Sequence, residues 1–188
     1  MKRKLLAAAA IVMCLSILAY GTLAYFTTED TAHNVITSGD IDIELLEWAD
    51  EVKTTPFPEN GVSGVMPGNQ ETKIVEVKNS GSNAAYIRVK VEKEILLPEG
   101  VEGEPNSDLI KMDFNETYWM LGDDGFYYYK AALKPDYVTE PLFASVSFDV
   151  SMGNIYQNST ASVDVIAYAV QVANNGDDVK DAKGWPEV

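Results

Sequence analysis

Cysteine and histidine are almost absent from this chain of 188 residues, which contains one Cys and one His. One cysteine cannot form a disulfide framework, and a Cys/His zinc site or a dyad of two histidines is excluded as well. A Ser-His-Asp triad would have to use His33, the only histidine, but no nucleophile-elbow motif G-x-S-x-G occurs in the chain. We therefore predict that the protein is not an enzyme and binds no cofactor.

Basic residues are also scarce. The chain has 14 Lys and Arg against 29 Asp and Glu, a formal net charge of −15 and a pI near 4.3. Nucleic acid and anionic lipid are therefore excluded as partners, because both would be repelled at neutral pH. Hydrophobic residues make up 46% of the chain, which is typical of a folded domain and not of a disordered one.

The first 24 residues have the pattern of an export signal. A basic stretch at residues 2–4 precedes twenty uncharged residues at 5–24, and small residues follow it. Two cleavage sites fit the preference for small side chains, one ending at Gly21 and the other formed by Thr22 and Ala24. Twenty apolar residues are also long enough to remain as a membrane anchor, so contact with the membrane is expected through this segment alone.

Cleavage after Ala24 would change the exported chain in two ways. The net charge would go from −15 to −18, because the three basic residues at 2–4 are lost and no acid is. Cys14 would be lost too, which leaves a chain without a thiol. These properties favour a protein that is secreted or held at the cell surface.

Beyond the signal, apolar and polar residues alternate with the period of half-buried strands. The segments are 40–45, 73–78, 85–95, 118–121, 126–133, 143–152 and 161–172. The Asp-Gly step within 122–125 predicts a hairpin between two aromatic segments. We predict an all-β fold, an antiparallel two-sheet sandwich that is jelly-roll-like and preceded by an N-terminal signal helix.

The pattern divides the chain into four parts. Residues 1–24 form the signal peptide, 25–38 an N-terminal arm, 39–173 the β-sandwich domain, and 174–188 an acidic C-terminal tail with at most one helical turn.

Acidic residues suggest one candidate cation site. Asp40, Asp42 and Glu44 fall on one face of a predicted strand, with about 6–7 Å between successive side chains. A hard cation would relieve their repulsion. Solvent-facing carboxylates at a strand edge explain the same pattern, and we favour this interpretation, which predicts no metal.

Aromatic residues cluster around the predicted hairpin. Period two places Tyr127 and Tyr129 on one face of their strand, and Phe126 and Tyr128 on the other. One of these faces must lie in the core. The other face either stacks on a sugar or a partner protein, or forms aromatic pairs across strands, which we favour.

Several short motifs occur along the chain. They are GTLAYFT at 21–27, NVITSGDIDI at 34–43, MPGNQ at 66–70, VKNSG at 77–81, AYIRV at 85–89, DDGFYYYK at 123–130, EPLF at 140–143 and AYAVQ at 167–171. These motifs resemble those of the alternate-signal exported proteins of Gram-positive bacteria, the TasA/camelysin-like family. The signal block carries the most specific part of the resemblance, and the further blocks extend it over most of the chain.

The resemblance implies processing by a SipW-type signal peptidase after Ala24, so that the exported chain begins at Tyr25. It also implies a jelly-roll-like sandwich and a structural role in an extracellular matrix or biofilm, or at the cell surface. Camelysin is described as a metalloprotease, but this sequence offers no recognisable zinc ligand set, so we do not expect that activity.

Two functions of different classes follow. We expect a subunit of an extracellular fibre that self-associates by β-strand pairing; the alternative is a surface-held binding module for a carbohydrate or protein ligand. In the first case the arm at 25–38 would complete a sheet edge, with Phe26, Val35 and Ile36 filling pockets on the acceptor. The arm can pair with its own sheet or with a neighbour, and both remain open at this stage.

Overall fold

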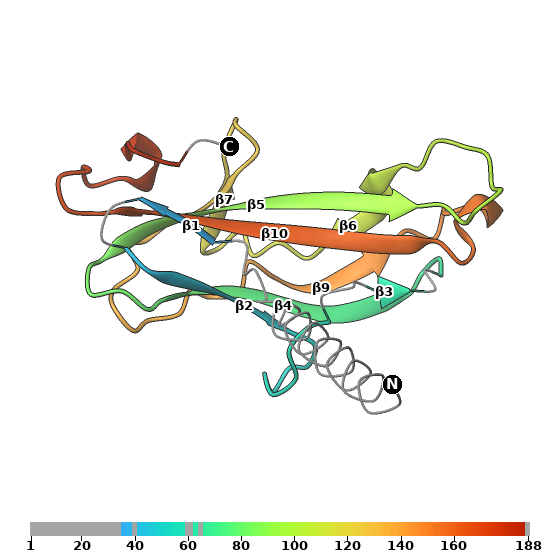
Figure 1. The fold of residues 1–188 in the computed structure, drawn as a ribbon, viewed down its shortest axis with the longest axis horizontal. Helices are drawn as coiled ribbons and strands as arrows, with labels where there is room; N and C mark the ends of the chain where they lie inside the picture. Colours follow the sequence, from blue (N-terminus) through green and yellow to red (C-terminus); the bar gives the residue numbers. More distant parts are fainter. Residues whose placement is uncertain (1–34, 39–40, 59–61, 64–65, 187–188) are drawn as a thin grey trace, which may run out of the picture. The chain divides into compact units, whose positions relative to one another are not determined.

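The computed structural model describes residues 35–38, 41–58, 62–63 and 66–186. These residues form two β-sheets that pack face to face, which confirms the predicted sandwich (Figure 1). Of residues 35–38 and 62–63 only the backbone is described. The signal helix expected at the N-terminus lies outside the described residues. No helix in the described part of the chain combines the length and apolar character needed to cross a membrane.

The first sheet has six strands in the order β1-β10-β5-β8-β7, with β3 pairing beside β10. Its strands are β1 (Val35–Ser38), β3 (Val62–Ser63), β5 (Ala85–Leu96), β7 (Trp119–Leu121), β8 (Tyr127–Tyr129) and β10 (Thr160–Gln171). The second sheet has four strands in the order β2-β4-β9-β6. They are β2 (Ile43–Trp48), β4 (Gln70–Asn79), β6 (Ile110–Met112) and β9 (Phe143–Phe148).

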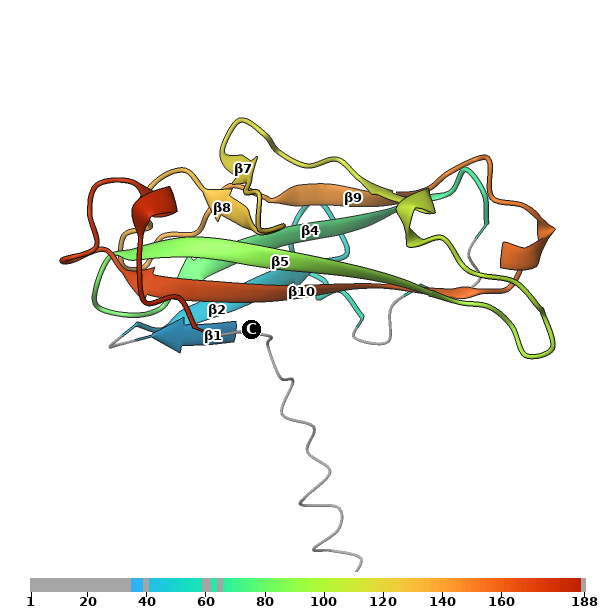
Figure 2. The same ribbon diagram turned by 90° about the horizontal axis from the view of Figure 1, so that it is seen from above.

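Successive strands alternate between the two sheets, and the one exception among the described strands is the β7–β8 hairpin. This crossing connectivity is what makes the sandwich jelly-roll-like. All described strand pairs are antiparallel except β1 and β10, which run parallel. The two views agree that β1 lies beside β10 at one edge of its sheet (Figures 1 and 2).

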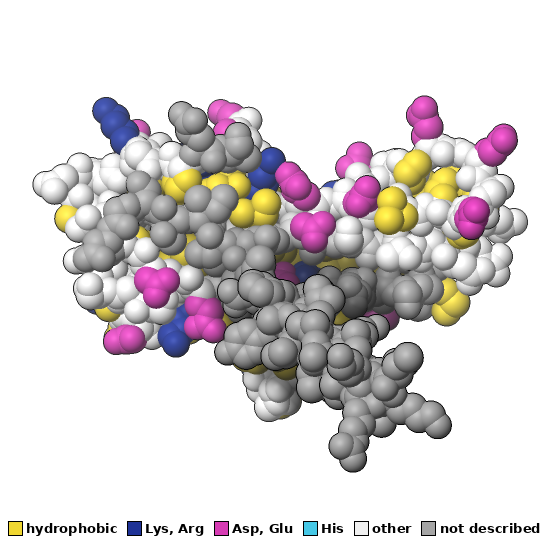
Figure 3. All heavy atoms as spheres, in the orientation of Figure 1, with side chains coloured by type: hydrophobic (Ala, Val, Ile, Leu, Met, Phe, Trp, Pro, Cys, Tyr) yellow, Lys and Arg dark blue, Asp and Glu magenta, His cyan; other side chains and the backbone are white. Residues whose placement is uncertain are grey.

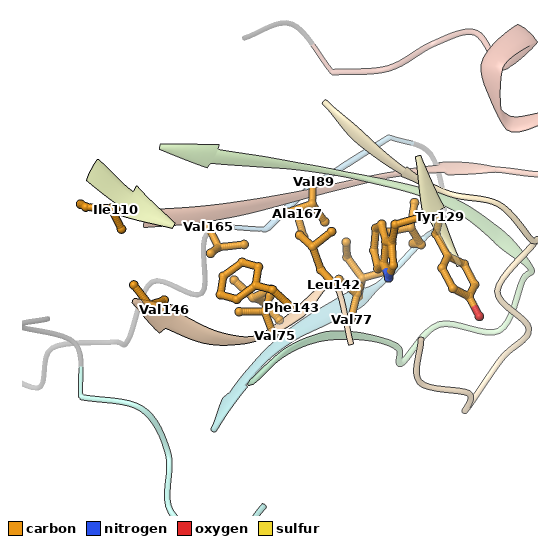
Figure 4. Close-up of a cluster of buried hydrophobic side chains, with 14 of the residues drawn as sticks. Val75, Val77, Val89, Ile110, Tyr129, Leu142, Phe143, Val146, Val165 and Ala167 are labelled. Atoms are coloured by element: carbon orange, nitrogen blue, oxygen red, sulfur yellow. The ribbon is translucent and has the colours of Figure 1, made fainter. Parts of the chain in front are cut away.

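The longest pair of strands forms the centre of the six-stranded sheet. β5 and β10 pair over their whole length, from Thr160 opposite Leu96 to Gln171 opposite Ala85. Their inward residues include Val89, Val165 and Ala167, which face side chains of the other sheet across the core (Figure 4). Alternation of apolar and polar residues thus buries one face of each strand, as the sequence predicts.

The inner core is dominated by branched aliphatic side chains. Val75 and Val77 of β4, Ile87 and Val89 of β5, and Leu142 are fully buried. Burial of this kind stabilises a fold by about 25 cal/mol for each Å² of apolar surface removed from water. The two sheets are therefore held together mainly by the hydrophobic effect.

The hairpin predicted at 122–125 is confirmed. Gly122 N–H donates to the Phe126 carbonyl over 2.8 Å, and Gly125 N–H donates to the Gly122 carbonyl over 3.1 Å. Gly125 has φ of +81°, a left-handed conformation that glycine adopts without steric cost.

Some predicted boundaries are wrong. The strand expected at 40–45 is β2, Ile43–Trp48, because Glu47 and Trp48 still pair with β4. The strand expected at 143–152 ends at Phe148, because Asp149 accepts hydrogen bonds from the backbone and side chain of Ser151 and turns the chain. The strand expected at 126–133 is only β8, Tyr127–Tyr129.

Candidate functional site

Two of the three residues named for strand donation, Phe26, Val35 and Ile36, lie in the described part of the chain. Val35 and Ile36 belong to β1, while Phe26 lies outside the described residues, as do the cleavage-site residues Thr22, Ala24 and Tyr25. Asp40 of the acidic group also lies outside them.

β1 pairs with the chain's own sheet. Its four residues run parallel to β10, with Val35 opposite Ala167 and Ser38 opposite Val170. β10 has β5 on its other side, so β1 closes the remaining edge over these residues. Of the two alternatives for the arm, the described conformation is therefore pairing within one chain.

The edge that β1 covers belongs to a buried part of β10. Ala167, Tyr168, Ala169 and Val170 are each at most 2% exposed, so both faces of β10 are packed here. Loss of β1 would leave backbone N–H and C=O groups of this buried strand without partners, which is unfavourable. A strand at this edge is therefore favoured, whether it comes from the same chain or from another one.

A close backbone contact fixes the chain where it enters β2. The Asp42 carbonyl accepts hydrogen bonds from the N–H groups of Ser80 and Gly81, over 3.0 and 2.9 Å. Gly81 N–H also donates to the Asn79 side chain over 3.0 Å. These hydrogen bonds hold the backbone at Asp42, only a few residues after β1, and so restrict where β1 can lie.

The aromatic hairpin places one set of rings in the core. Tyr127 stacks on Phe114 with ring centres 4.2 Å apart, and Tyr129 lies 5.1 Å from Trp119, its cross-strand partner. The Tyr129 hydroxyl donates to the Glu140 carboxylate. Burial, and then the Glu140 carboxylate, raise the pKa of Tyr129 to about 12.

The other set of rings lies on the outer face of the same sheet. Phe126 contacts Tyr168 edge to face at 5.4 Å, and Tyr128 contacts Trp185 in the same manner at 5.9 Å. Aromatic pairs are thus present on both faces, but among these contacts only Trp119 and Tyr129 lie opposite each other on paired strands, as expected. Trp185 comes from the C-terminal tail, so the chain itself covers this face. The rings of Phe126 and Tyr128 are therefore not exposed for stacking on a sugar or a partner protein.

The acidic tail is consequently more than a solvated extension. It contains η3 (Val179–Asp181), the single helical turn expected there, and Val179 is 2% exposed. Val179 and Ala182 pack on the outer aromatic cluster together with Trp185. Residues 173–186, which we call the C-terminal strap, thus complete a second hydrophobic core on the outer face.

Arg88 is the polar centre of this outer cluster. Its guanidinium carbon lies 4.0 Å from the ring centre of Phe126, and Nη2 donates to the Pro186 carbonyl over 3.2 Å. Asp124 lies 3.8 Å from Nη1 and accepts a 2.6 Å hydrogen bond from Tyr128. Burial, and then the hydrogen bond to Asp124, raise the pKa of Tyr128. These contacts fix the strap to β5 and β8.

The acidic ladder does not form a cation site in the described residues. Asp42 is exposed, and Glu44 lies 3.8 Å from Lys78 on the neighbouring strand, so its charge is offset. In residues 41–58 and 66–186, no group of three or more Asp, Glu, His or Cys side chains is placed to hold a metal ion.

Comparison of the chain with models of protein families, with curated proteins and with solved structures finds no match. Functional arguments therefore depend on the residues and contacts of this chain.

Proposed function

We propose that this protein is a secreted or cell-surface structural protein, a subunit of an extracellular matrix or biofilm fibre assembled by β-strand pairing. The observation that carries the proposal is the place of β1 (Val35–Ser38): a four-residue strand at the end of the arm that closes an edge of the six-stranded sheet. The export pattern of residues 1–24 and the resemblance to alternate-signal exported proteins support an extracellular location.

Exchange of β1 between copies would use an edge that already exists. The same main-chain groups of Ala167–Val170 would pair with β1 of a neighbour in place of the chain's own. Exchange of an identical element costs little, because the strand pairing that breaks within one chain forms again between two chains. A head-to-tail exchange does not close on itself and so extends into a filament.

Two partners follow from this proposal. The first is a signal peptidase of the SipW type, which would cut after Ala24 and free the arm. The second is another copy of the chain, which would accept Val35 and Ile36 at its β10 edge.

Deletion of residues 25–38 from the secreted chain tests the proposal. The truncated protein should remain a folded, β-rich monomer that forms no filaments by negative-stain microscopy, but binds a synthetic peptide of residues 25–38. A matched peptide with Ile36→Pro should not bind, because proline lacks the N–H and does not fit a paired strand.

Three results would contradict strand donation by this segment. They are filaments of unchanged appearance from the truncated protein, equal binding of the two peptides, and a full-length secreted chain that stays monomeric at high concentration and at its pI.

A further inference from the structure

A hollow of about 550 Å³ lies on the outer face of the four-stranded sheet, away from the residues that pair with β1. Its floor is the cross-strand pair Leu46 and Glu76, and Trp48 follows on β2. The facing wall is the segment at 138–141, which backbone hydrogen bonds from Thr139 and Leu142 hold against β4. The volume is in the range of small-molecule sites.

A carboxylate is buried at the floor of this hollow. Glu76 is only 4% exposed, and its Oε1 accepts a 2.6 Å hydrogen bond from Lys53 Nζ. A buried charge is unfavourable unless it is paired, and Lys53 supplies the opposite charge. The ion pair makes the floor neutral overall while it keeps polar atoms there.

Lys53 is held in place by an ordered turn with a strained backbone. Its φ is +55°, in the left-handed region that non-glycine residues rarely adopt. Asp50 fixes this turn by accepting hydrogen bonds from the N–H groups of Thr54 and Thr55, over 3.1 and 2.6 Å. Hydrogen bonds from Thr55 and Thr54 hold the pKa of Asp50 at about 2. Such strain is typical of functional sites, where it positions a side chain in advance.

One polar group in the lining is unsatisfied. Trp48 Nε1 is buried and has no hydrogen-bond partner among the described residues. A buried N–H without a partner is rare and unfavourable, so an acceptor from outside the chain would be a gain.

The lining of the hollow also contains apolar side chains. Val138 in the wall is 41% exposed, and Leu46 and Pro141 are partly exposed beside it. Apolar side chains around a polar floor are typical of a surface that binds a ligand.

We propose that this hollow binds a short stretch of a neutral oligosaccharide. Sugar hydroxyls accept hydrogen bonds, so they match a site that offers the Lys53 ammonium, whose side chain is 41% exposed, and the unpartnered Trp48 N–H as donors. The C–H face of a sugar ring packs on the flat, amphipathic surface of Trp48. The net charge of −15 disfavours anionic sugars, because they would be repelled.

The proposal goes beyond fibre formation and does not depend on it. A structural subunit with this hollow would hold matrix carbohydrate on a face that strand exchange leaves free. The outer face of Phe126 and Tyr128, where a sugar was the alternative to aromatic pairs, is covered by the strap, so the proposed ligand site lies on the other sheet.

Titration of the secreted chain with a panel of trisaccharides tests the proposal. The panel contains β-linked glucose, β-linked N-acetylglucosamine and α-linked mannose as neutral probes, with a galacturonate trimer as the anionic one. Calorimetry should give saturable binding of at least one neutral trimer with a Kd below about 1 mM, and no binding of the anionic trimer.

Three variants place the binding at the hollow. Trp48→Ala, which removes ring and N–H together, should weaken it about tenfold, and Trp48→Phe, which keeps a ring and removes the N–H, should weaken it several-fold. Tyr118→Ala is the matched control, since Tyr118 is 43% exposed beside β7 of the other sheet, and this variant should bind like the parent chain. Thermal melts show that each variant is folded.

Failure of all neutral trimers to bind would overturn the proposal. So would tighter binding of the anionic trimer, or neutral binding that Trp48→Ala and Trp48→Phe leave unchanged. Fibre assembly is measured separately, so a failure here leaves the strand-donation test unaffected.

Discussion

The guanidinium carbon of Arg88 lies 4.8 Å from the ring centre of Trp185, although the two residues belong to β5 and to the C-terminal strap. Arg88 is 8% exposed and also contacts the rings of Phe126 and Tyr168. A cation so placed over several aromatic faces is attracted to each of them. Arg88 therefore links β5, β10, the β7–β8 hairpin and the strap on the outer face.

The strap should contribute measurably to stability. Trp185→Ala removes the ring that contacts Arg88 and Tyr128, and we expect it to lower the free energy of unfolding by about 1–3 kcal/mol. Urea denaturation measures the change. Trp185→Phe is the control and should keep most of the stability; an unchanged midpoint for Trp185→Ala would mean that the strap is not held as described.

The sequence predicted well what local patterns determine. β5, β10 and the β7–β8 hairpin were predictable, because long alternation and an Asp-Gly turn are properties of neighbouring residues. β3 and β6 were not, since they contain only two and three residues and form by pairing with distant strands. β1 was predicted only as part of an arm that completes a sheet edge, because its four residues do not show which strand they pair with.

The candidate sites were also predictable only as far as local sequence patterns determine them. Period two placed Phe126 and Tyr128 on one face, but only the fold shows that Trp185 covers that face. The hollow was missed because Lys53 and Glu76 come together through a turn, and nothing in either segment's own pattern connects them. The positive φ of Lys53 could not be predicted either, because the position is not a glycine, the residue that usually marks such a conformation.

Processing should yield a chain that begins at Tyr25. Ala24→Phe should block cleavage, because the −1 position accepts only small side chains. Gly21→Phe is the matched control, since it blocks only the competing site and should leave the same N-terminus. N-terminal sequencing of secreted material checks both; a start at Thr22, or an intact Met1, would contradict the prediction.

Assembly should be favoured by acid and by salt. A chain cut after Ala24 would carry a charge near −18, and such chains would repel one another. Acidic side chains are prominent at both ends of the face in Figure 3. Protonation of carboxylates toward the pI near 4.3 removes the charge, and salt screens it over about 8–10 Å. Light scattering should therefore show more association near pH 4.5 than at pH 8 and low salt; the reverse order would contradict this.

Tyr129 should ionise only at strongly alkaline pH. Its pKa in the folded chain is about 12, against 10 for a free tyrosine, because burial and then the Glu140 carboxylate disfavour the phenolate. The folded pKa is raised, so the stabilisation is fully present below pH 10 and is lost as pH rises through 12. The difference in tyrosinate absorbance between the parent chain and Tyr129→Phe should rise with a midpoint near pH 12; a midpoint near 10 would mean an exposed hydroxyl.

The last prediction concerns Gly81, which lies against the chain where it enters β2. A Cβ added at Gly81 would lie 2.9 Å from the backbone nitrogen of Asp42, closer than real contacts allow. The obstacle is backbone and cannot rotate away, so Gly81→Ala should displace the segment whose carbonyl now accepts hydrogen bonds from Ser80 and Gly81. We expect a loss of about 1–3 kcal/mol in unfolding free energy, as for other overpacked sites.

This displacement should also loosen β1, because β1 ends only a few residues before Asp42. Hydrogen exchange of the amides in β1 should be faster in Gly81→Ala than in the parent chain. Gly153→Ala is the matched control: a Cβ there has no atom within 4 Å and φ is −80°, so both stability and exchange should be unchanged. Equal behaviour of the two variants would show that contact with Asp42 does not restrain the arm.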